Sequence, residues 1–225
     1  EFFVLYCLFK SDSSCEEAMS DIFDLFRKLE KKKETVQPIS VLVACLGNPG
    51  KEYAFTRHNS GFLFAEYYSQ KKNFQIDRAK FDGLCGETTL GGVRALFLCP
   101  TTYMNCSGTA VRKAADFYKI PPEKIFVVCD DVNFEVGKLR IRKKGSDGGQ
   151  KGLRDIIGKM GSEDIPRIRI GVGKKPTPDY DLADWVLGQF SKEDRKTLEE
   201  VFCRCGEALE LAVQGKFEEA MGKYN

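Results

Sequence analysis

The sequence predicts a single layered α/β domain. Its 225 residues fit one ordinary globular domain, and 42% hydrophobic with 30% charged residues is typical of a soluble protein. The runs "ISVLVACLG" and "KIFVVCDD" are short and apolar, as in strands that are buried on both faces of a sheet. Because such runs alternate with segments of helical periodicity, we expect a sheet covered by helices.

The N-terminal part of the chain differs from the rest. Apolar residues at helical spacing after Ser20, a suitable N-cap, predict an amphipathic helix over 20–34 that leads into a charged linker. We therefore divide the chain into an N-terminal extension, residues 1–38, and the domain proper, residues 39–225. The native origin of residues 1–18 stays open, and we give them no functional role.

The first half of the domain begins with a buried strand that stops at Gly47. A helix follows the next loop, and two strands then flank the turn at Gly91 and Gly92, residues that suit a tight hairpin. A second helix comes before a pair of prolines, which cannot continue it. The expected elements are a strand over 39–47, a helix over 61–72, strands over 84–90 and 93–99, and a helix over 107–120.

The second half repeats the alternation. A continuous apolar run predicts another buried strand, an alternating run predicts a half-buried one, and the C-terminal stretch lacks proline and has helical periodicity. The expected elements are strands over 124–131, 137–143 and 167–173, and helices over 149–160 and 191–225.

Cysteine usage and hydropathy indicate the compartment. The nine cysteines are scattered, several within apolar runs, as expected of reduced core thiols. Cys203 and Cys205 have no second cysteine pair or histidine nearby, so we expect no metal site and no cofactor. No window holds 18 uninterrupted apolar residues, and the apolar run at 2–9 lacks the basic flank of a secretory signal. We expect a cytoplasmic protein that does not enter a membrane.

Charge is unevenly distributed along the chain. Residues 138–175 contain twelve Lys and Arg against four acidic residues, a local net charge of +8 in a chain whose total is +2. This segregation is typical of a surface that binds a polyanion, although a solvated basic face would have the same composition.

His58 is the only histidine in the chain, and it lies in a loop that follows the first buried strand. Asn48, Asn105 and Asp130 come from loops or strand ends that can converge on the same edge of an α/β sheet. A neutral imidazole can take a proton from water, a carboxylate can orient the imidazole, and amides can hold a carbonyl that gains negative charge. Without a G-x-S-x-G elbow, this set favours direct attack by water.

Each of these residues also has a structural interpretation. A lone histidine is often a satisfied polar group in a loop, the two asparagines suit turns and helix caps, and the aspartate can end a strand. Residue spacing alone leaves both interpretations open.

The blocks "LGNPGKEYAFTRHNSGF", "PTTYMNCSG", "DDVNFEVGKLRIRKKGSDGG" and "RIRIGVG" resemble, in order and spacing, the bacterial-type peptidyl-tRNA hydrolase family. The resemblance extends from about Val41 to Gln189 and implies a mixed, largely parallel twisted sheet flanked by helices. It also implies a hydrolase of translation that cleaves the ester between a peptide, or an N-blocked amino acid, and tRNA. The implied state is a monomer, with peptidyl-tRNA and not DNA as the partner.

The resemblance assigns roles to individual residues. His58 resembles the general base and Asp130 the residue that orients it, while Asn48 and Asn105 resemble the groups that hold the substrate. The peptide cleft and the shape of the site are assigned to Tyr103, Met104, Tyr53 and Asn59. For tRNA we turn to the basic segment, because contacts to phosphates give affinity independent of base sequence. The residues that we expect to make these contacts are Arg142, Lys143, Lys144, Lys151 and Arg169.

One departure from the family pattern concerns the site. Where the family commonly reads G-G-H-N-G, this chain reads "GGQKG", which places Gln150 and Lys151 at the histidine and asparagine positions. We include both among the substrate-binding residues, because a lysine offers donors and charge, although no acceptor. The departure also favours an alternative: a non-catalytic RNA-binding or RNA-processing protein of the same fold. An unrelated small-molecule hydrolase or nucleotide-binding α/β enzyme would require the motif matches to be accidental.

Overall fold

The computed structural model describes residues 37–225, and Ile39–Asn225 form one compact unit. The predicted helix over 20–34, its cap Ser20 and residues 1–18 lie outside the described residues. The assignment of residues 1–38 to an extension therefore stays a prediction. Within the described part of the chain, no helix is long and apolar enough to cross a membrane.

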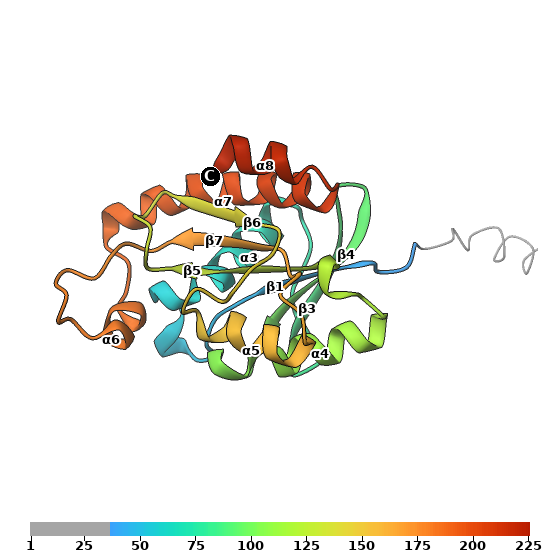
Figure 1. Cartoon of the computed structure of the whole chain (residues 1–225), viewed down its shortest axis with the longest axis horizontal. Helices are drawn as coiled ribbons and strands as arrows, with labels where there is room; N and C mark the ends of the chain where they lie inside the picture. The colour runs from blue at the N-terminus through green and yellow to red at the C-terminus, as the bar shows by residue number, and fades with distance from the viewer. Residues whose placement is uncertain (1–36) are drawn as a thin grey trace, which may run out of the picture. The chain divides into compact units, whose positions relative to one another are not determined.

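A seven-stranded sheet with the order β2-β3-β4-β1-β5-β7-β6 forms the middle of the domain (Figure 1). Neighbouring strands among β4, β1, β5 and β7 are parallel, whereas β2-β3, β3-β4 and β6-β7 are antiparallel pairs. The mixed, largely parallel sheet is thus confirmed. The strands are β1 Val41–Cys45, β2 Arg78–Lys80, β3 Gly83–Leu90, β4 Val93–Pro100, β5 Ile125–Asp131, β6 Leu139–Arg142 and β7 Arg167–Gly171.

Helices cover both faces of the sheet, with α7 and α8 on one side and α4 and α5 on the other (Figure 1). The helix α3 packs with α7, and the short α6 lies beyond one end of the sheet. The helices are α3 Ser60–Lys71, α4 Ser107–Tyr118, α5 Lys151–Met160, α6 Leu182–Leu187, α7 Lys192–Val213 and α8 Phe217–Tyr224; the 3-10 turns are η2 Lys51–Tyr53, η3 Arg57–Asn59, η4 Met104–Cys106 and η5 Pro122–Lys124.

The strand β1 shows why its sequence is apolar throughout. Val41 and Val43 pack in the core beneath α3 and α7, whereas Leu42 and Ala44 pack in the core beneath α4 and α5. Successive side chains of a strand point to opposite faces, so a central strand between two helical layers has no polar face. All five residues of β1 are buried.

The expected strands and helices are present, with differences in detail. The short edge strand β2 and the helix α6 were not expected. The C-terminal helical stretch is divided, because Gly215 at φ 82° ends α7 and lets the chain turn into α8. The helix α4 ends at Tyr118, before the prolines, and its C-cap Lys119 has a left-handed φ of 56°. Several expected elements were too long at one or both ends, among them 39–47, 107–120, 137–143, 149–160, 167–173 and 191–225.

The fold brings the carboxyl ends of β1, β4 and β5 to one edge of the sheet. These three strands lie side by side with β1 in the middle, so the chain that leaves β1 and the chain that leaves β5 emerge next to each other. Ligands of open α/β sheets bind at such an edge, where the strand order reverses.

Gly61 allows the first turn of α3 to lie against these strand ends. A Cβ at this position would be 2.4 Å from the backbone nitrogen of Leu46 and 2.6 Å from the carbonyl oxygen of Val128. No residue other than glycine fits without a shift of the backbone. This close approach places η3, and His58 within it, directly over the end of β5.

Candidate active site

A cleft of about 660 Å³ opens at this edge of the sheet. Its walls come from the loop after β1, from η3 and η4, from the end of β5, from the turn before α5 and from α6. The lining residues include Asn48, His58, Tyr103, Met104, Asn105, Asp130, Asp131, Asn133, Gln150, Lys151, Arg169, Leu182 and Leu187.

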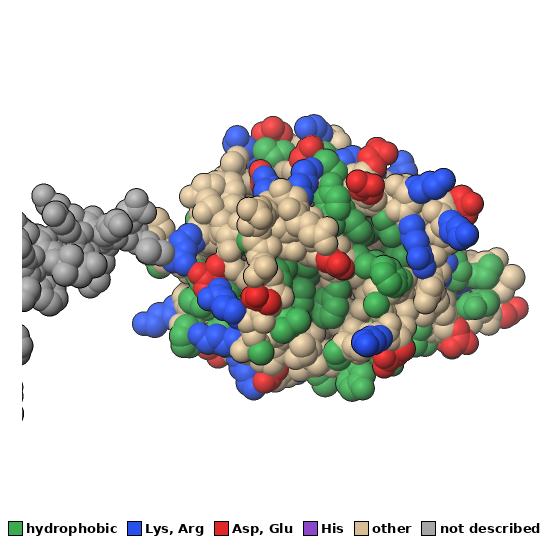
Figure 2. Space-filling view, turned by 180° about the vertical axis from the view of Figure 1, so that it is seen from behind, with side chains coloured by type: hydrophobic (Ala, Val, Ile, Leu, Met, Phe, Trp, Pro, Cys, Tyr) green, Lys and Arg blue, Asp and Glu red, His purple; other side chains and the backbone are tan. Residues whose placement is uncertain are grey.

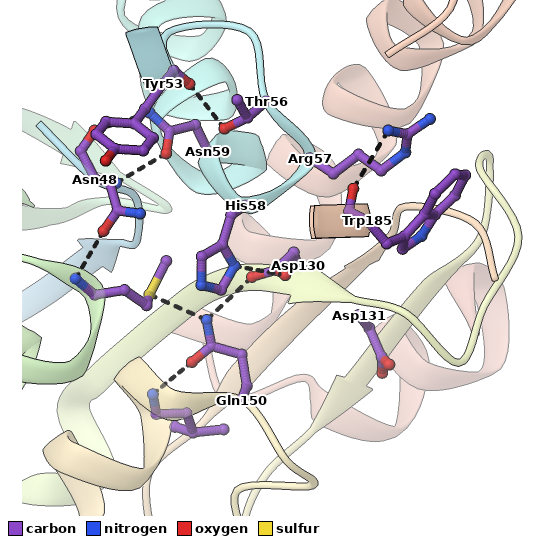
Figure 3. A network of polar contacts seen from close by, with 12 residues as sticks. Asn48, Tyr53, Thr56, Arg57, His58, Asn59, Asp130, Asp131, Gln150 and Trp185 are labelled. Atoms are coloured by element: carbon purple, nitrogen blue, oxygen red, sulfur yellow. Dashed lines mark hydrogen bonds and ion pairs between the residues drawn. The ribbon is translucent and has the colours of Figure 1, made fainter. Parts of the chain in front are cut away.

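The side chains of His58 and Asp130 form a pair in this cleft (Figure 3). His58 Nδ1 lies 2.8 Å from Asp130 Oδ2, and the two side chains are 14% and 4% exposed. An ionised carboxylate only accepts hydrogen bonds, so the proton of a neutral imidazole is placed on Nδ1. The Nε2 atom of His58 then carries a lone pair, which is what a general base requires.

The turn that carries His58 is held by its own backbone and by the segment after α6. Thr56 donates from both its amide and its hydroxyl to the carbonyl of Tyr53, at 3.0 and 2.8 Å. The amide of Arg57 donates to the Gly188 carbonyl at 3.0 Å. Tyr53 thus shapes the turn, and its side chain is not among those that line the cleft.

Arg57 joins the same turn to α6. Its guanidinium carbon lies 3.7 Å from the ring centre of Trp185, and Nη1 lies 3.4 Å from the Trp185 carbonyl oxygen. Burial lowers the pKa of Arg57 from its ordinary value. The stacked pair connects the wall of the cleft to the residue next to His58 (Figure 3).

Asn48 is fixed by a buried network of hydrogen bonds. Its backbone amide donates to Asn59 Oδ1 at 2.8 Å, and Asn59 Nδ2 donates back to the backbone carbonyl of Asn48 at 3.0 Å. The backbone amide of Met104 donates to Asn48 Oδ1 at 2.8 Å. This hydrogen bond from Met104 fixes the orientation of the Asn48 side chain. Its Nδ2 group, which is a donor, then faces the side on which His58 lies (Figure 3).

The loop after β4 contributes another side of the cleft. Tyr103 is 63% exposed, Met104 is buried, and Asn105 is exposed at the cleft surface. Ser107 Oγ donates to the Met104 carbonyl at 2.8 Å, which holds η4 at the start of α4. The exposed side-chain amide of Asn105 and the fixed side-chain amide of Asn48 give the cleft two groups able to contact a carbonyl or hydroxyl of a ligand.

Gln150 and Lys151 follow a glycine turn at the start of α5. Gln150 is buried; its Oε1 accepts from the Leu153 amide at 2.7 Å, and its Nε2 donates to Asp130 Oδ1 at 3.0 Å. Lys151 is exposed and lines the cleft. The two residues that depart from the family pattern therefore have different surroundings.

Asp131 and Arg169 form an ion pair next to the His58–Asp130 pair. Arg169 Nε lies 3.1 Å from Asp131 Oδ2, and Asn133 donates from its amide and its side chain to Asp131 Oδ1 at 2.9 Å each. Arg169 Nη2 also donates to the Gly148 carbonyl at 3.1 Å. The pair holds the glycine turn before α5 against the end of β5, so Arg169 lines the cleft with its charge already paired.

Metal-ligating side chains do not cluster within residues 37–225, and the cysteine beside Asp130 is buried. No group of three or more His, Cys, Asp or Glu side chains could hold a metal ion there. Cys129 precedes Asp130, but burial raises the pKa of its thiol well above the ordinary value. A protonated thiol is a poor nucleophile. The arrangement instead suits a base that activates water beside two amides.

Comparison with known proteins agrees with this geometry. The family model described as peptidyl-tRNA hydrolase matches residues 42–225. The chain belongs to the peptidyl-tRNA hydrolase family. The peptidyl-tRNA hydrolase of Clostridium novyi is 45% identical, covering 82% of this chain and 97% of the relative, and that of Caldanaerobacter subterraneus is 47% identical, covering 82% and 98%. The crystal structure of peptidyl-tRNA hydrolase from Acinetobacter baumannii has a TM-score of 0.76 and 34% identity, covering 83% of this chain and 97% of that one.

The site residues expected from the sequence fall into three groups in the structure. His58, Asp130, Asn48, Asn105, Tyr103, Met104, Gln150, Lys151 and Arg169 line the cleft. Tyr53 and Asn59 support the loops behind it. The last three, Arg142, Lys143 and Lys144, are exposed at the end of the edge strand β6, outside the cleft.

One wall of the cleft was not expected from the sequence. Leu182 and Leu187 of α6 are 47% and 40% exposed, and both line it. The signal that could have found this helix is Asp181, whose side chain accepts from the amides of Ala183 and Asp184, as an N-cap does. The helix gives the cleft an apolar side.

Proposed function

We propose that this protein hydrolyses the ester bond between a peptide, or an N-blocked amino acid, and the ribose of tRNA. The observation that carries the proposal is the His58–Asp130 pair, which leaves a basic Nε2 in a cleft whose other walls carry amides and apolar groups. Membership of the peptidyl-tRNA hydrolase family supports the choice of substrate. The reaction returns free tRNA to translation.

In the proposed mechanism His58 acts on water. Nε2 takes a proton from a water molecule while its oxygen adds to the ester carbonyl carbon. Asp130 accepts a hydrogen bond from Nδ1–H and stabilises the imidazolium that forms. The carbon–oxygen bond to the ribose then breaks, and the proton on Nε2 passes to the ribose oxygen. The products are a peptide with a free carboxyl group and a tRNA with a free hydroxyl.

The amides have a binding role in this proposal. The free Nδ2 of Asn48 and the exposed side chain of Asn105 donate to the carbonyl oxygens of the ester and of the adjacent peptide bond. Donors that are fixed before the substrate arrives stabilise developing charge without reorganisation. Asn48 meets this condition, because Asn59 and Met104 hold its backbone and its Oδ1.

The tRNA-binding surface is proposed to extend from the cleft to β6. Leu139 and Ile141 point into the core while Arg140 and Arg142 alternate with them, and Lys143 and Lys144 continue the basic run. The reverse face in Figure 2 instead shows Lys and Arg intermingled with Asp and Glu around hydrophobic side chains. A surface of one sign attracts phosphates better than a mixed one.

The experiment that tests the proposal is single-turnover hydrolysis of N-acetyl-aminoacyl-tRNA, compared with free aminoacyl-tRNA, at low and high salt. Fast release from the blocked substrate, slow release from the free one and inhibition by salt would support it. Tight binding of tRNA without ester cleavage would reject it and favour the non-catalytic RNA-binding alternative. The variant His58→Ala is the negative control, since it removes the only imidazole of the chain.

A further inference from the structure

We infer that Gln150 is a positioning residue that fixes the carboxylate of Asp130, and through it the tautomer of His58. The inference rests on the proposed function in assigning a base role to His58. It assigns Gln150 a role within the protein in place of the substrate contact expected from the sequence. The three side chains form one chain of contacts, from the start of α5 to the cleft (Figure 3).

The orientation of the Gln150 amide follows from its partners. The backbone amide of Leu153 can only donate, so the atom 2.7 Å from it is the carbonyl oxygen Oε1. The nitrogen Nε2 must then face Asp130 Oδ1, at 3.0 Å, with its second hydrogen toward Met104 Sδ, at 3.2 Å. A flipped amide would place an oxygen against a carboxylate and an NH₂ group against an N–H. Only one orientation satisfies the site.

The Asp130 carboxylate gains a separate partner for each oxygen. Oδ2 accepts from His58 Nδ1 at 2.8 Å and Oδ1 accepts from Gln150 Nε2 at 3.0 Å. The residue is only 3% exposed, so water cannot easily replace a lost donor. Without Gln150, the carboxylate would have a single directional contact and could rotate about its χ2 angle. The Nδ1–H form of His58 would then lose its fixed acceptor.

The chemistry of the amide also matters for charge. Gln150 donates to the carboxylate at every pH, because a primary amide does not titrate in the range where proteins are folded. Its Oε1 simultaneously caps α5, so the donor cannot turn away without leaving the Leu153 amide unpaired. The chain therefore keeps one ionisable imidazole in the site and supports it with a neutral group.

Three variants separate these roles. Gln150→Ser keeps an N-cap acceptor but is too short to donate to Asp130. Gln150→His can accept from the Leu153 amide through Nδ1 and donate to Asp130 through Nε2 while the new ring is neutral. Thr197→Ser, a conservative change at an exposed position of α7, which contributes no residue to the cleft, serves as the control for handling and folding.

The expected kinetic result is a fall in kcat for Gln150→Ser of roughly tenfold, a fraction of the about 10²- to 10⁴-fold that a general base contributes. KM should stay within about twofold, because the substrate does not contact Gln150. Gln150→His should keep most of the wild-type kcat at high pH, with an acid limb of the pH profile that is steeper than in the wild type. In Gln150→His, the introduced imidazole can no longer accept a hydrogen bond from the Leu153 amide once its Nδ1 is protonated.

A spectroscopic measurement tests the same inference without any substrate. His58 is the only histidine, so ¹⁵N signals of the imidazole ring report its tautomer without assignment work. The wild type should show a protonated Nδ1 and an unprotonated Nε2, and Gln150→Ser should show a mixture. Unchanged ring signals in Gln150→Ser together with wild-type kcat would overturn the inference. If the wild type hydrolysed no ester, the proposed function would fail while the ring signals still decided the role of Gln150.

Discussion

At the scale of single residues, the site depends on which nitrogen of His58 carries the proton. Asp130 lies 2.8 Å from Nδ1 and is almost fully buried. A carboxylate there favours the tautomer that leaves Nε2 free, whereas an amide in its place can present a donor to the ring and favour the other tautomer. The geometry of the side chain is the same in both cases, and only the hydrogen bond changes.

The variant Asp130→Asn should therefore keep the fold and lower kcat by roughly 10³- to 10⁴-fold, as a wrong tautomer does in the serine-protease triad. Single-turnover hydrolysis of N-acetyl-aminoacyl-tRNA measures the effect, and circular dichroism checks the fold. Asp164→Asn removes the same charge from an exposed position and should leave turnover unchanged. Turnover within twofold of wild type in Asp130→Asn would contradict the role assigned to this carboxylate.

The two neighbouring aspartates show what the sequence could and could not predict at this scale. Residues next to each other in a strand point to opposite faces, so Asp130 and Asp131 cannot contact the same partner. The family pattern selected Asp130 in advance, and the structure brings it to His58. The pairing of Asp131 with Arg169 and the contact from Gln150 depend on which segments meet across the sheet edge. No local pattern in the sequence encodes those neighbours.

At the scale of elements, the position of α3 decides where the histidine turn lies. Its first turn rests on the backbone of β1 and β5 at Gly61, where a Cβ would be 2.4 Å from Leu46 N. Backbone atoms cannot move aside as a flexible side chain can. The contact is therefore a fixed spacing between the helix and the strands.

We expect Gly61→Ala to lower the free energy of unfolding by about 2 kcal/mol or more, because it overpacks a contact between backbones. Urea unfolding followed by circular dichroism measures the change. Gly158→Ala is the matched control, since a Cβ at that exposed helical position has no atom within 4 Å. It should stabilise the protein by about 0.5–1 kcal/mol. Equal stabilities for the two alanine variants would refute the close-approach argument.

The helix α6 depends on Arg57, whose guanidinium stacks on Trp185 at 3.7 Å. A lysine keeps the charge but loses the planar stacking surface. We expect Arg57→Lys to raise KM about fivefold, equivalent to about 1 kcal/mol of a cation–π contact, and to change kcat less. Steady-state kinetics separate the two parameters. Arg112→Lys, at an exposed guanidinium of α4 that pairs with Asp116, is the control; an equal rise in KM there would contradict a specific role for Arg57.

The pair α3 and α7 is joined by a contact that depends on pH. Tyr68 donates to Glu210 Oε1 at 2.7 Å, and Lys72 Nζ lies 2.8 Å from the same oxygen. Partial burial raises the pKa of Glu210, but the hydrogen bonds from Lys72 and Tyr68 outweigh it, so the pKa is lower than usual. The ionised group thus stabilises the fold above its unfolded pKa, and this contribution is lost as pH falls through the lower folded pKa.

Glu210→Gln should accordingly reduce the free energy of unfolding at pH 7 by less than about 1 kcal/mol, because the ion pair is partly screened by solvent. The difference from wild type should fade as the pH falls through the lowered folded pKa of Glu210, where the wild-type carboxyl becomes protonated. Urea unfolding at several pH values measures it. Glu199→Gln removes an exposed charge from the same helix and should show no such trend. A difference that grows toward low pH would have the wrong sign for this mechanism.

How much of the elements could be predicted follows from their surroundings. Strands such as β1, buried on both faces, have a continuous apolar sequence that is hard to mistake. The edge strand β2 has three exposed residues, so its backbone pairing with β3 leaves no hydrophobic signal. The helix α6 has six residues, and its apolar side chains line a cleft instead of the core. Short elements with little core contact carry too little pattern to be predicted.

At the scale of the whole molecule, part of the basic segment is structural. Arg167 is buried and donates to four backbone carbonyls of the chain around it, at Ile165, Gly145, Ser146 and Glu163. Burial lowers its pKa from the ordinary value. Residue counting over 138–175 therefore overstates the positive charge that is available to a ligand. The charges at the end of β6 remain exposed.

These exposed charges lead to a prediction about salt. Changing Arg142, Lys143 and Lys144 together to Gln should raise KM for peptidyl-tRNA at low salt and leave kcat nearly unchanged, because the reacting groups lie elsewhere. Each lost phosphate contact should make the plot of log(kcat/KM) against log salt less steep by roughly 0.9, a value typical of duplex nucleic acid, so by up to about 3 for the three together. Kinetics across a salt series measures the slope. The control changes three exposed lysines on other elements, Lys119, Lys124 and Lys196. It alters the net charge of the protein equally, so equal slopes in the two triple variants would show that net charge, and not a surface at β6, attracts the tRNA.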